Sequence, residues 1–286
     1  MKKNLYVPSE ETKSQYLARF LSDKRKMGKV HSVFKTSFNI MVGRDLINFS
    51  SQGMTLSAYG CILNQETMKQ LVSAAKPGDI VRVQGERFTF YTIQEVLEVD
   101  LSEIGTTDLS IPDLQLSQKE ITQTGMYVGL DSFTFNGKIG LKNEEQTQVA
   151  FQALQTISQQ DEKIVEEAVA YLIGRGQGLT PSGDDMLLGY TMVRKAFNHQ
   201  DSFDQIVEKV LKNKSTTDIS AAHYRALLAG YVSSLFISLI LNVGTATQEK
   251  VNALIKNIGR YGHTSGYDTL FGFYLGLQSL ASEVTE

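Results

Sequence analysis

The sequence predicts an α+β protein, with a β-rich, barrel-like N-terminal domain over residues 1–142 and an all-helical domain over residues 143–286. The first observation is a series of short runs rich in β-branched and aromatic residues, which are typical of strands and extend to about Val99. The second is a change after Asn143, where apolar residues recur at helical spacing. The third is a motif that occurs twice in the helical half.

The composition is that of a globular protein with a full core. The chain has 286 residues, enough for one large domain or two ordinary ones, with 42% hydrophobic and 21% charged residues. Its formal net charge of −3 gives no electrostatic reason to expect binding to nucleic acid or to an anionic membrane surface. We therefore expect neither of them as a partner.

The cysteine content and the N-terminus bear on the cellular compartment. Cys61 is the only cysteine, so an intrachain disulfide is excluded, as is usual in a reducing compartment, and we expect its thiol to be buried and inert. The N-terminal lysines are not followed by an apolar segment, so no secretory signal is expected. These observations predict a cytoplasmic protein.

The N-terminal half is predicted to alternate strands with two helices. A short polar helix is expected over Glu10 to Asp23, and a second over Asn64 to Lys76, where Pro77-Gly78 ends it. The predicted strands are residues 30–34, 38–42, 46–49, 56–63, 80–83 and 88–99. Residues 100–143 contain short apolar pairs and several glycines, and we interpret them as further short strands and loops.

The C-terminal half is predicted to be helical throughout. The expected helices are residues 144–159, 161–172, 182–197, 203–212, 247–257 and 265–282. Residues 226–243 carry no charge, but Gly230 and several polar residues interrupt them, and the run barely reaches the length of a membrane span. We interpret this stretch as a buried central helix.

Two segments of the helical half resemble each other. Residues 182–190 read SGDDMLLGY and residues 265–273 read SGYDTLFGF, so Ser, Gly, Asp, Leu and Gly recur at a constant offset of 83 positions. Upstream, Ile173-Gly174-Arg175 matches Ile258-Gly259-Arg260, and residues 178–180 match 262–264 after small differences in length. The pattern predicts a duplicated helix–loop–helix unit.

The simplest interpretation of both loops is helix capping. Ser182 with Asp185, and Ser265 with Asp268, fit the spacing of a capping box. An alternative register makes Thr180 the cap and the proline after it the first helical residue.

Three features exceed what capping requires. Gly174, Gly176 and Gly178 supply more backbone freedom than a cap needs, Asp184 adds a second carboxylate, and two helix N-termini side by side would attract an anion. Arg175 and Arg260 would add positive charge. We therefore predict a pocket between the loops that binds a small carboxylate or phosphate. The candidate ligand-binding residues are Arg175, Gly176, Gly178, Thr180, Ser182, Gly183, Thr217, Ser220, His263, Thr264, Ser265 and Gly266.

Asp184, Asp185 and Asp268 are the candidate catalytic residues. Carboxylates repel an anion, so Asp184 and Asp185 need a further role beside an anionic ligand. Three alternatives remain: one of them is a general base, one of them pairs with Arg175, or a divalent cation such as Mg²⁺ lies between them and a phosphate. The four histidines, His199 among them, lack metal-ligand spacing, so no metal site is assigned and no other cofactor is expected.

These motifs resemble a bacterial family associated with the AllH-type subunit of oxamate carbamoyltransferase. The resemblance lies in GLTPSGDD at residues 178–185, in Thr217-x-x-Ser220-Ala221, in GHTSGYDTLFG at residues 262–272, and in His31-Ser32-Val33-Phe34 and Asn39-Ile40. It implies a role in allantoin breakdown, in which oxalurate and phosphate give oxamate and carbamoyl phosphate. It also implies that this chain is one of several different subunits.

Three hypotheses follow for the function. The chain is an enzyme subunit that transfers a carbamoyl group between small anions, or it is a non-catalytic subunit that binds an anion and docks its partners. The third is that both loops are only capping devices and that the function resides in the β-rich domain.

Overall fold

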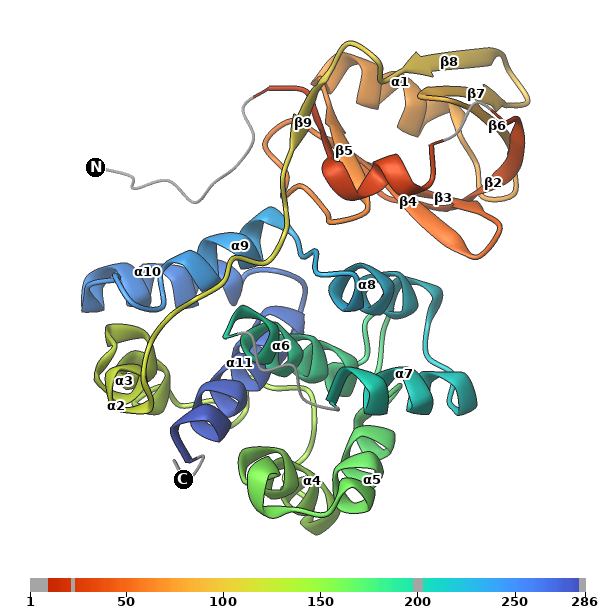
Figure 1. Ribbon diagram of the computed structural model, residues 1–286. Coiled ribbons are helices and arrows are strands. Elements are labelled where there is room, and N and C mark those ends of the chain that lie inside the picture. The colour runs from red at the N-terminus through yellow and green to blue at the C-terminus, as the bar shows by residue number, and fades with distance from the viewer. Residues whose placement is uncertain (1–9, 22–23, 198–202, 283–286) are drawn as a thin grey trace. The chain divides into compact units, whose positions relative to one another are not determined.

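The computed structural model describes residues 10–21, 24–197 and 203–282, and it divides into two compact units. The first comprises Met1–Ser110 with Tyr231–Ile237, and the second comprises Ile111–Gly230 with Ser238–Glu286. A curled sheet forms the first unit and helices form the second, so the α+β class is confirmed (Figure 1). His199 and the first nine residues, on which the secretory-signal prediction rests, lie outside the described residues.

The sheet of the first unit has nine described strands, most of them antiparallel. They are β1 (Thr12–Ser14), β2 (Lys26–Val33), β3 (Ser37–Val42), β4 (Asp45–Ser51), β5 (Gly60–Leu63), β6 (Ile80–Gln84), β7 (Arg87–Tyr91), β8 (Val96–Asp100) and β9 (Gly105–Thr107). Their order across the sheet is β8-β7-β6-β2-β3-β4-β5-β1-β9, and only the β4–β5 and β1–β9 pairs are parallel. The single run predicted over residues 88–99 is in fact a hairpin of two strands, β7 and β8.

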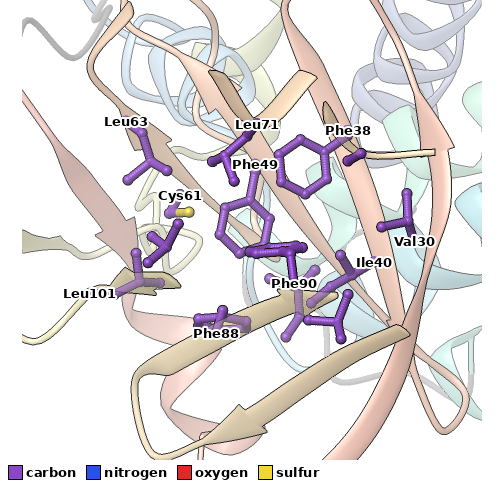
Figure 2. Close-up of a cluster of buried hydrophobic side chains, with 14 of the residues drawn as sticks. Val30, Phe38, Ile40, Phe49, Cys61, Leu63, Leu71, Phe88, Phe90 and Leu101 are labelled. Carbon is purple, nitrogen blue, oxygen red and sulfur yellow. The ribbon is translucent and has the colours of Figure 1, made fainter. Parts of the chain in front are cut away.

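Aromatic side chains fill the concave side of this sheet (Figure 2). The rings of Phe38 and Phe49 stack with their centroids 4.9 Å apart. Phe90 meets Phe38 edge-on at 5.5 Å, and Phe88 meets Phe49 in the same way at 5.2 Å. Cys61 lies in the same core, where burial raises the pKa of its thiol, which agrees with the predicted inert role.

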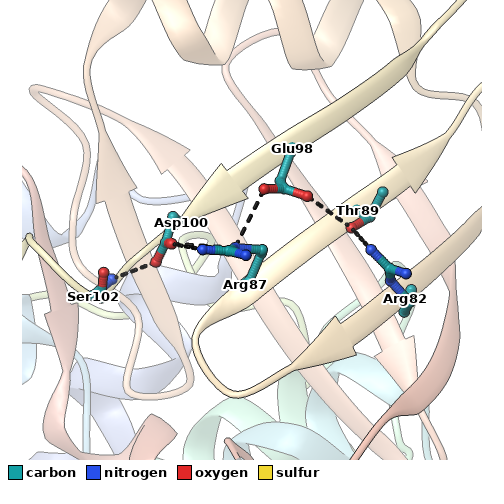
Figure 3. A network of polar contacts seen from close by, with 6 residues as sticks. All are labelled: Arg82, Arg87, Thr89, Glu98, Asp100 and Ser102. Atoms are coloured by element: carbon teal, nitrogen blue, oxygen red, sulfur yellow. Dashed lines mark hydrogen bonds and ion pairs between the residues drawn. The ribbon is translucent and has the colours of Figure 1, made fainter.

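A network of charged and polar side chains on β6, β7 and β8 lies on the opposite face (Figure 3). Arg87 on β7 is within 3.3 Å of Glu98 and 3.0 Å of Asp100, both on the neighbouring strand β8. Arg82 on β6 donates a hydrogen bond to Thr89 on β7. Because alternate strand residues point to opposite faces, the same strands supply both the aromatic core and this exposed polar network.

The prediction of a helix from Glu10 to Asp23 is wrong. Residues 12–14 form the short strand β1 and residues 15–19 a short 3₁₀ helix, because β1 pairs with β5 on one side and with β9 on the other. Tertiary pairing therefore overrides the local preference. The predicted helix near residues 64–76 is confirmed as α1 (Gln65–Ala74), and the Asn64 side chain caps it by accepting a hydrogen bond from the amide of Thr67.

The second unit consists of helices arranged around a central pair. They are α2 (Gln118–Gln123), α3 (Gly125–Asp131), α4 (Glu145–Gln155), α5 (Glu162–Leu172), α6 (Ser182–Ala196), α7 (Phe203–Asn213), α8 (Asp218–Leu228), α10 (Gln248–Ile258) and α11 (Ser265–Ser282). Helices α6 and α11 lie at the centre of this unit, and the others surround them (Figure 1).

Residues 100–143 differ from the prediction of short strands and loops. Only β9 is a strand, and α2 and α3 follow it before residue 143, where the helical domain was expected to begin. Each helix starts with a side-chain cap: Ser117 and Glu120 form a capping box for α2, and Thr124 caps α3. Helices this short show too few apolar positions for periodicity to reveal them.

The uncharged stretch from residue 226 to 243 is not one helix. Helix α8 ends at Leu228, Gly230 has a φ of 87°, and α9 (Ser234–Leu241) begins four residues later. The left-handed glycine turns the chain between them, so the prediction of a single central helix is wrong. No helix in the described part of the chain is long and apolar enough to span a membrane.

Candidate functional site

Two glycines allow the backbones of α6 and α11 to touch. A Cβ atom at Gly189 would lie 2.1 Å from the carbonyl oxygen of Thr269, and one at Gly272 would lie 1.8 Å from that of Met186. The contact is reciprocal, because both glycines and both carbonyls are 83 positions apart. The two helices therefore cross in close contact shortly after they begin.

The loops that precede these helices also lie together. We call residues 173–181 the first loop and residues 259–264 the second loop. The hydroxyl of Thr180, near the end of the first loop, is 2.9 Å from that of Ser265, which follows the second loop. The two helix starts are therefore side by side, as the predicted site requires.

The backbone of each loop folds back in the same way. The Gly183 amide donates to the carbonyl of Arg175 at 2.8 Å, and the Gly266 amide donates to the carbonyl of Tyr261 at 3.0 Å. By these contacts Arg175 corresponds to Tyr261, and not to Arg260 as the sequence comparison suggested. Neither glycine amide is free to bind an anion, which weakens the simplest form of the predicted anion site.

Both predicted capping arrangements of α6 are wrong. Pro181 occupies the N-cap position, no side chain caps the helix, and Ser182 is its first residue. Ser265 is likewise the first residue of α11 and lies inside that helix. The aspartates that follow these serines are therefore available for other contacts.

Asp184 holds three segments together. Its Oδ1 accepts hydrogen bonds from the amide of Gly174 at 2.9 Å and from the hydroxyl of Tyr224 at 3.1 Å. Its Oδ2 accepts a further bond from the hydroxyl of Thr216, and the side chain is fully buried. Because both of its oxygens accept hydrogen bonds, Asp184 is suited to hold the first loop and the start of α8 in place rather than to transfer a proton.

Asp185 lies between the two loops and is almost fully buried. The hydroxyls of Ser265 and Thr180 lie near its carboxyl group and favour its charged form. Burial nevertheless raises the pKa of Asp185 well above its usual value, and the nearby charges of Asp268 and Asp184 act in the same direction. Asp185 therefore retains its proton to a higher pH than an exposed aspartate.

Asp268 has the mirrored environment at the start of α11. It is fully buried, its Oδ1 accepts a bond from the amide of Gly140 at 2.8 Å, and the hydroxyls of Thr264 and Ser182 lie near it. Burial raises the pKa of this carboxyl too. Each of the two aspartates thus has near it one hydroxyl from its own loop region and one from that of the other loop. We refer to Asp185 and Asp268 as the acid pair.

The acid pair is incompletely satisfied. Within the described residues, Oδ2 of Asp185, Oδ2 of Asp268 and Oγ of Ser220 are buried without a hydrogen-bond partner. An unpartnered buried polar atom costs stability, so it calls for an explanation such as a ligand or a catalytic role. All three residues are among those predicted from the sequence.

The predicted cations are not paired with the aspartates. Arg175 stacks on the ring of Tyr171, with its guanidinium carbon 3.8 Å from the ring centroid. In the described parts of the chain, no ion pair joins Arg175 or Arg260 to the three aspartates, and no group of three or more acidic, histidine or cysteine side chains could hold a metal ion. The Mg²⁺ between Asp184 and Asp185 stays a prediction.

The remaining predicted residues differ in how far they are exposed to solvent. Gly176, Gly178 and His263 are exposed, whereas Thr180, Thr264 and Ser265 are half-buried. Thr217 caps α8 and donates a bond to the carbonyl of Leu179 at the tip of the first loop.

Sequence reasoning missed three contributors: Gly140, Thr216 and Tyr224. A Cβ atom at Gly140 would lie 2.1 Å from Oγ of Ser182, so a larger residue there would force this hydroxyl to move. The sole signal for it was that it is one of several glycines in a stretch without clear periodicity. No local pattern marks the hydroxyls that reach Asp184.

The comparisons with known proteins concern the same segments. A family model described as oxamate carbamoyltransferase subunit AllH matches residues 172–277, which contain both loops and the acid pair. A second, described as the AllH family N-terminal domain, matches residues 9–106, which contain the sheet. The word subunit in the first description implies other protein chains in a complex. No solved structure matches the chain.

Proposed function

Because this chain belongs to the AllH family, we propose that it is a subunit of a carbamoyltransferase that acts on small anions in allantoin breakdown. Oxalurate and phosphate are its substrates, and oxamate and carbamoyl phosphate are the products. The observation that carries the proposal is the acid pair: two buried carboxyl groups with raised pKa values, each with an oxygen that has no partner. Such groups are characteristic of sites that move protons.

The reaction requires one proton to be removed and one to be delivered. An oxygen of hydrogen phosphate attacks the carbamoyl carbon of oxalurate and loses its proton, and the bond from that carbon to the oxamate nitrogen breaks. The leaving nitrogen takes up a proton and becomes the amide of oxamate. A pair of carboxyl groups of which one is protonated serves both needs, since one accepts the first proton while the other donates the second.

The raised pKa values also reconcile buried acids with an anionic ligand. A charged carboxylate repels phosphate, whereas a protonated carboxyl group donates a hydrogen bond to it. We propose that the hydroxyls of Thr180, Thr264 and Ser265 bind the ligand beside the acid pair, beneath the exposed tips of the loops.

We further propose that α5–α6 and α10–α11 arose by duplication of one helix–loop–helix unit. The reciprocal glycine contacts, the matching fold-back of the loops and the exchanged hydroxyls of the acid pair support this origin. Duplication would explain why two carboxyl groups occupy equivalent positions about one site.

A non-catalytic role is the second candidate, and one observation favours it. The amides of Gly183 and Gly266 are already bonded within their own loops, so the helix starts offer a ligand fewer donors than expected. In this case the chain binds a small anion or serves as a scaffold for its partners without carrying out the chemistry.

The test is turnover by the complex assembled with Asp185→Asn or Asp268→Asn. Carbamoyl phosphate formation from oxalurate and phosphate is measured at saturating substrate. We expect kcat to fall by about 100-fold to 10,000-fold, the usual contribution of a general acid or base. Asp161→Asn is the matched control, because Asp161 is an exposed aspartate at another helix start and its side chain makes no cap bond.

Unchanged kcat in both acid-pair variants, with assembly intact, would rule out the catalytic role and leave the scaffold role. A parallel loss in the Asp161 control would show that the effect is not specific to the acid pair.

A further inference from the structure

A cleft of about 740 Å³ lies in the helical unit between α4, α11 and the segment from residue 135 to 143. Its size is within the range of small-molecule sites. Gln148, Gln152 and Gln155 line it from α4, and their spacing of four and three residues puts them on one face of that helix. The cleft thus has a wall of carboxamide groups.

The cleft continues the face of α11 that begins at the acid pair. Asp268, Phe271, Leu275 and Gln278 follow one another at spacings of three, four and three residues, and the last three line the cleft. Gly140, whose amide bonds to Asp268, lies between two cleft-lining residues of the connecting segment. A ligand in the cleft would therefore lie next to the backbone that holds Asp268.

Several polar groups of this wall are available to a ligand. Among the described residues, the side-chain amides of Gln152 and Gln155 have no hydrogen-bond partner. Gln278 uses its Nε2 to donate to the hydroxyl of Tyr274, so its carbonyl oxygen is still able to accept. Lys142 brings one positive charge to the same cleft.

We propose that this cleft binds a small planar molecule that carries an amide or urea group together with a carboxylate. Each glutamine offers a donor and an acceptor in one plane, which matches the N–H and C=O groups of such a molecule. Lys142 supplies the charge that a carboxylate requires, and the rings of Phe151 and Phe271 supply flat apolar faces. The substrate class rests on the proposed function, whereas the cleft and its lining do not.

The proposal is tested by calorimetric titration of the full-length chain with oxamate and, separately, with oxalate. Oxalate has the carboxylates but no amide N–H group, so we expect oxamate to bind at least threefold more tightly. Gln152→Ala and Gln278→Ala should each weaken oxamate binding by about threefold to tenfold, as expected for loss of one neutral hydrogen bond. Gln146→Ala is the matched control, because Gln146 is also on α4 but lines a different groove.

Absence of oxamate binding at millimolar concentration, equal binding of oxalate, or an equal effect of Gln146→Ala would each overturn the proposal. Separate measurements distinguish this test from that of the catalytic role. Loss of oxamate affinity in Gln152→Ala and Gln278→Ala supports the cleft whatever the kcat of Asp185→Asn, and unchanged affinity in both overturns it even if that kcat falls.

Discussion

In the described part of the chain, the two units of this protein differ in where their carboxyl groups lie. In the sheet unit, aromatic rings occupy the core, and Arg87, Glu98 and Asp100 form their contacts on the exposed face (Figures 2 and 3). In the helical unit, the acid pair and Asp184 are buried at the start of the two central helices. Burial of a carboxyl group costs free energy unless it is fully bonded. The buried carboxyl groups of the acid pair, each with an oxygen that lacks a partner, therefore reduce the stability of the helical unit, and a functional role explains them better.

The largest expected effect is on the contact between α6 and α11. Gly272→Ala places a Cβ atom 1.8 Å from the Met186 carbonyl, so the two central helices must separate. We expect the free energy of unfolding to fall by about 3 kcal/mol or more, as measured by denaturant unfolding.

The matched control for this substitution lies in the other unit. A Cβ atom at Gly105 in β9 meets its nearest neighbour at 3.6 Å, an ordinary contact, so Gly105→Ala should change stability far less. Equal stability of Gly272→Ala and the unaltered protein would show that the helices do not cross as described.

A smaller effect is expected on the pH dependence of stability. The usual aspartate pKa is 3.8, and burial raises those of Asp185 and Asp268 in the folded state. Between 3.8 and the raised values, the folded protein binds more protons than the unfolded chain, so the free energy of unfolding falls as pH rises through this window. Replacing both aspartates by asparagine should reduce that slope, measured by denaturant unfolding at a series of pH values. An unaltered slope would mean that neither carboxyl group has a raised pKa.

The smallest effect is expected at the exposed network of the sheet unit. Arg87→Ala removes the contacts with Glu98 and Asp100, but all three side chains are largely open to solvent, where water and salt screen such pairs. We expect the thermal unfolding midpoint to stay essentially unchanged. A large decrease would mean that the sheet unit also depends on its charges, and the contrast between the units would fail.

The sequence predicted the structure best where a regular apolar spacing extends over many residues or where a motif repeats. The strands from β2 to β4 and the helices from α4 to α7 follow directly from apolar spacing, and the repeat led to the two helix starts that the structure places side by side. Short elements such as β1, α2 and α3 were missed, because tertiary pairing or side-chain caps determine them. The break at Gly230 was missed because a glycine in an apolar run is compatible with a helix until its φ is known.

The candidate site was only partly predictable for a similar reason. Spacing along the chain identified the acid pair and the hydroxyls near it, but it assigned Ser182 and Asp185 to one cap. In the structure Ser182 lies near Asp268, and Asp185 lies near Ser265. Gly140 and Tyr224 come from segments distant in sequence, and one sequence alone carries no sign of their approach.

The central claim is that Asp185 and Asp268 are held in the fold with raised pKa values. Carbon-13 NMR of aspartate carboxyl groups, recorded across pH on the unaltered chain and on Asp185→Asn and Asp268→Asn, tests it most directly. We predict two carboxyl resonances that titrate clearly above the usual aspartate range, one of them lost in each variant. Titration of every aspartate carboxyl near or below its usual value of 3.8 would contradict the account.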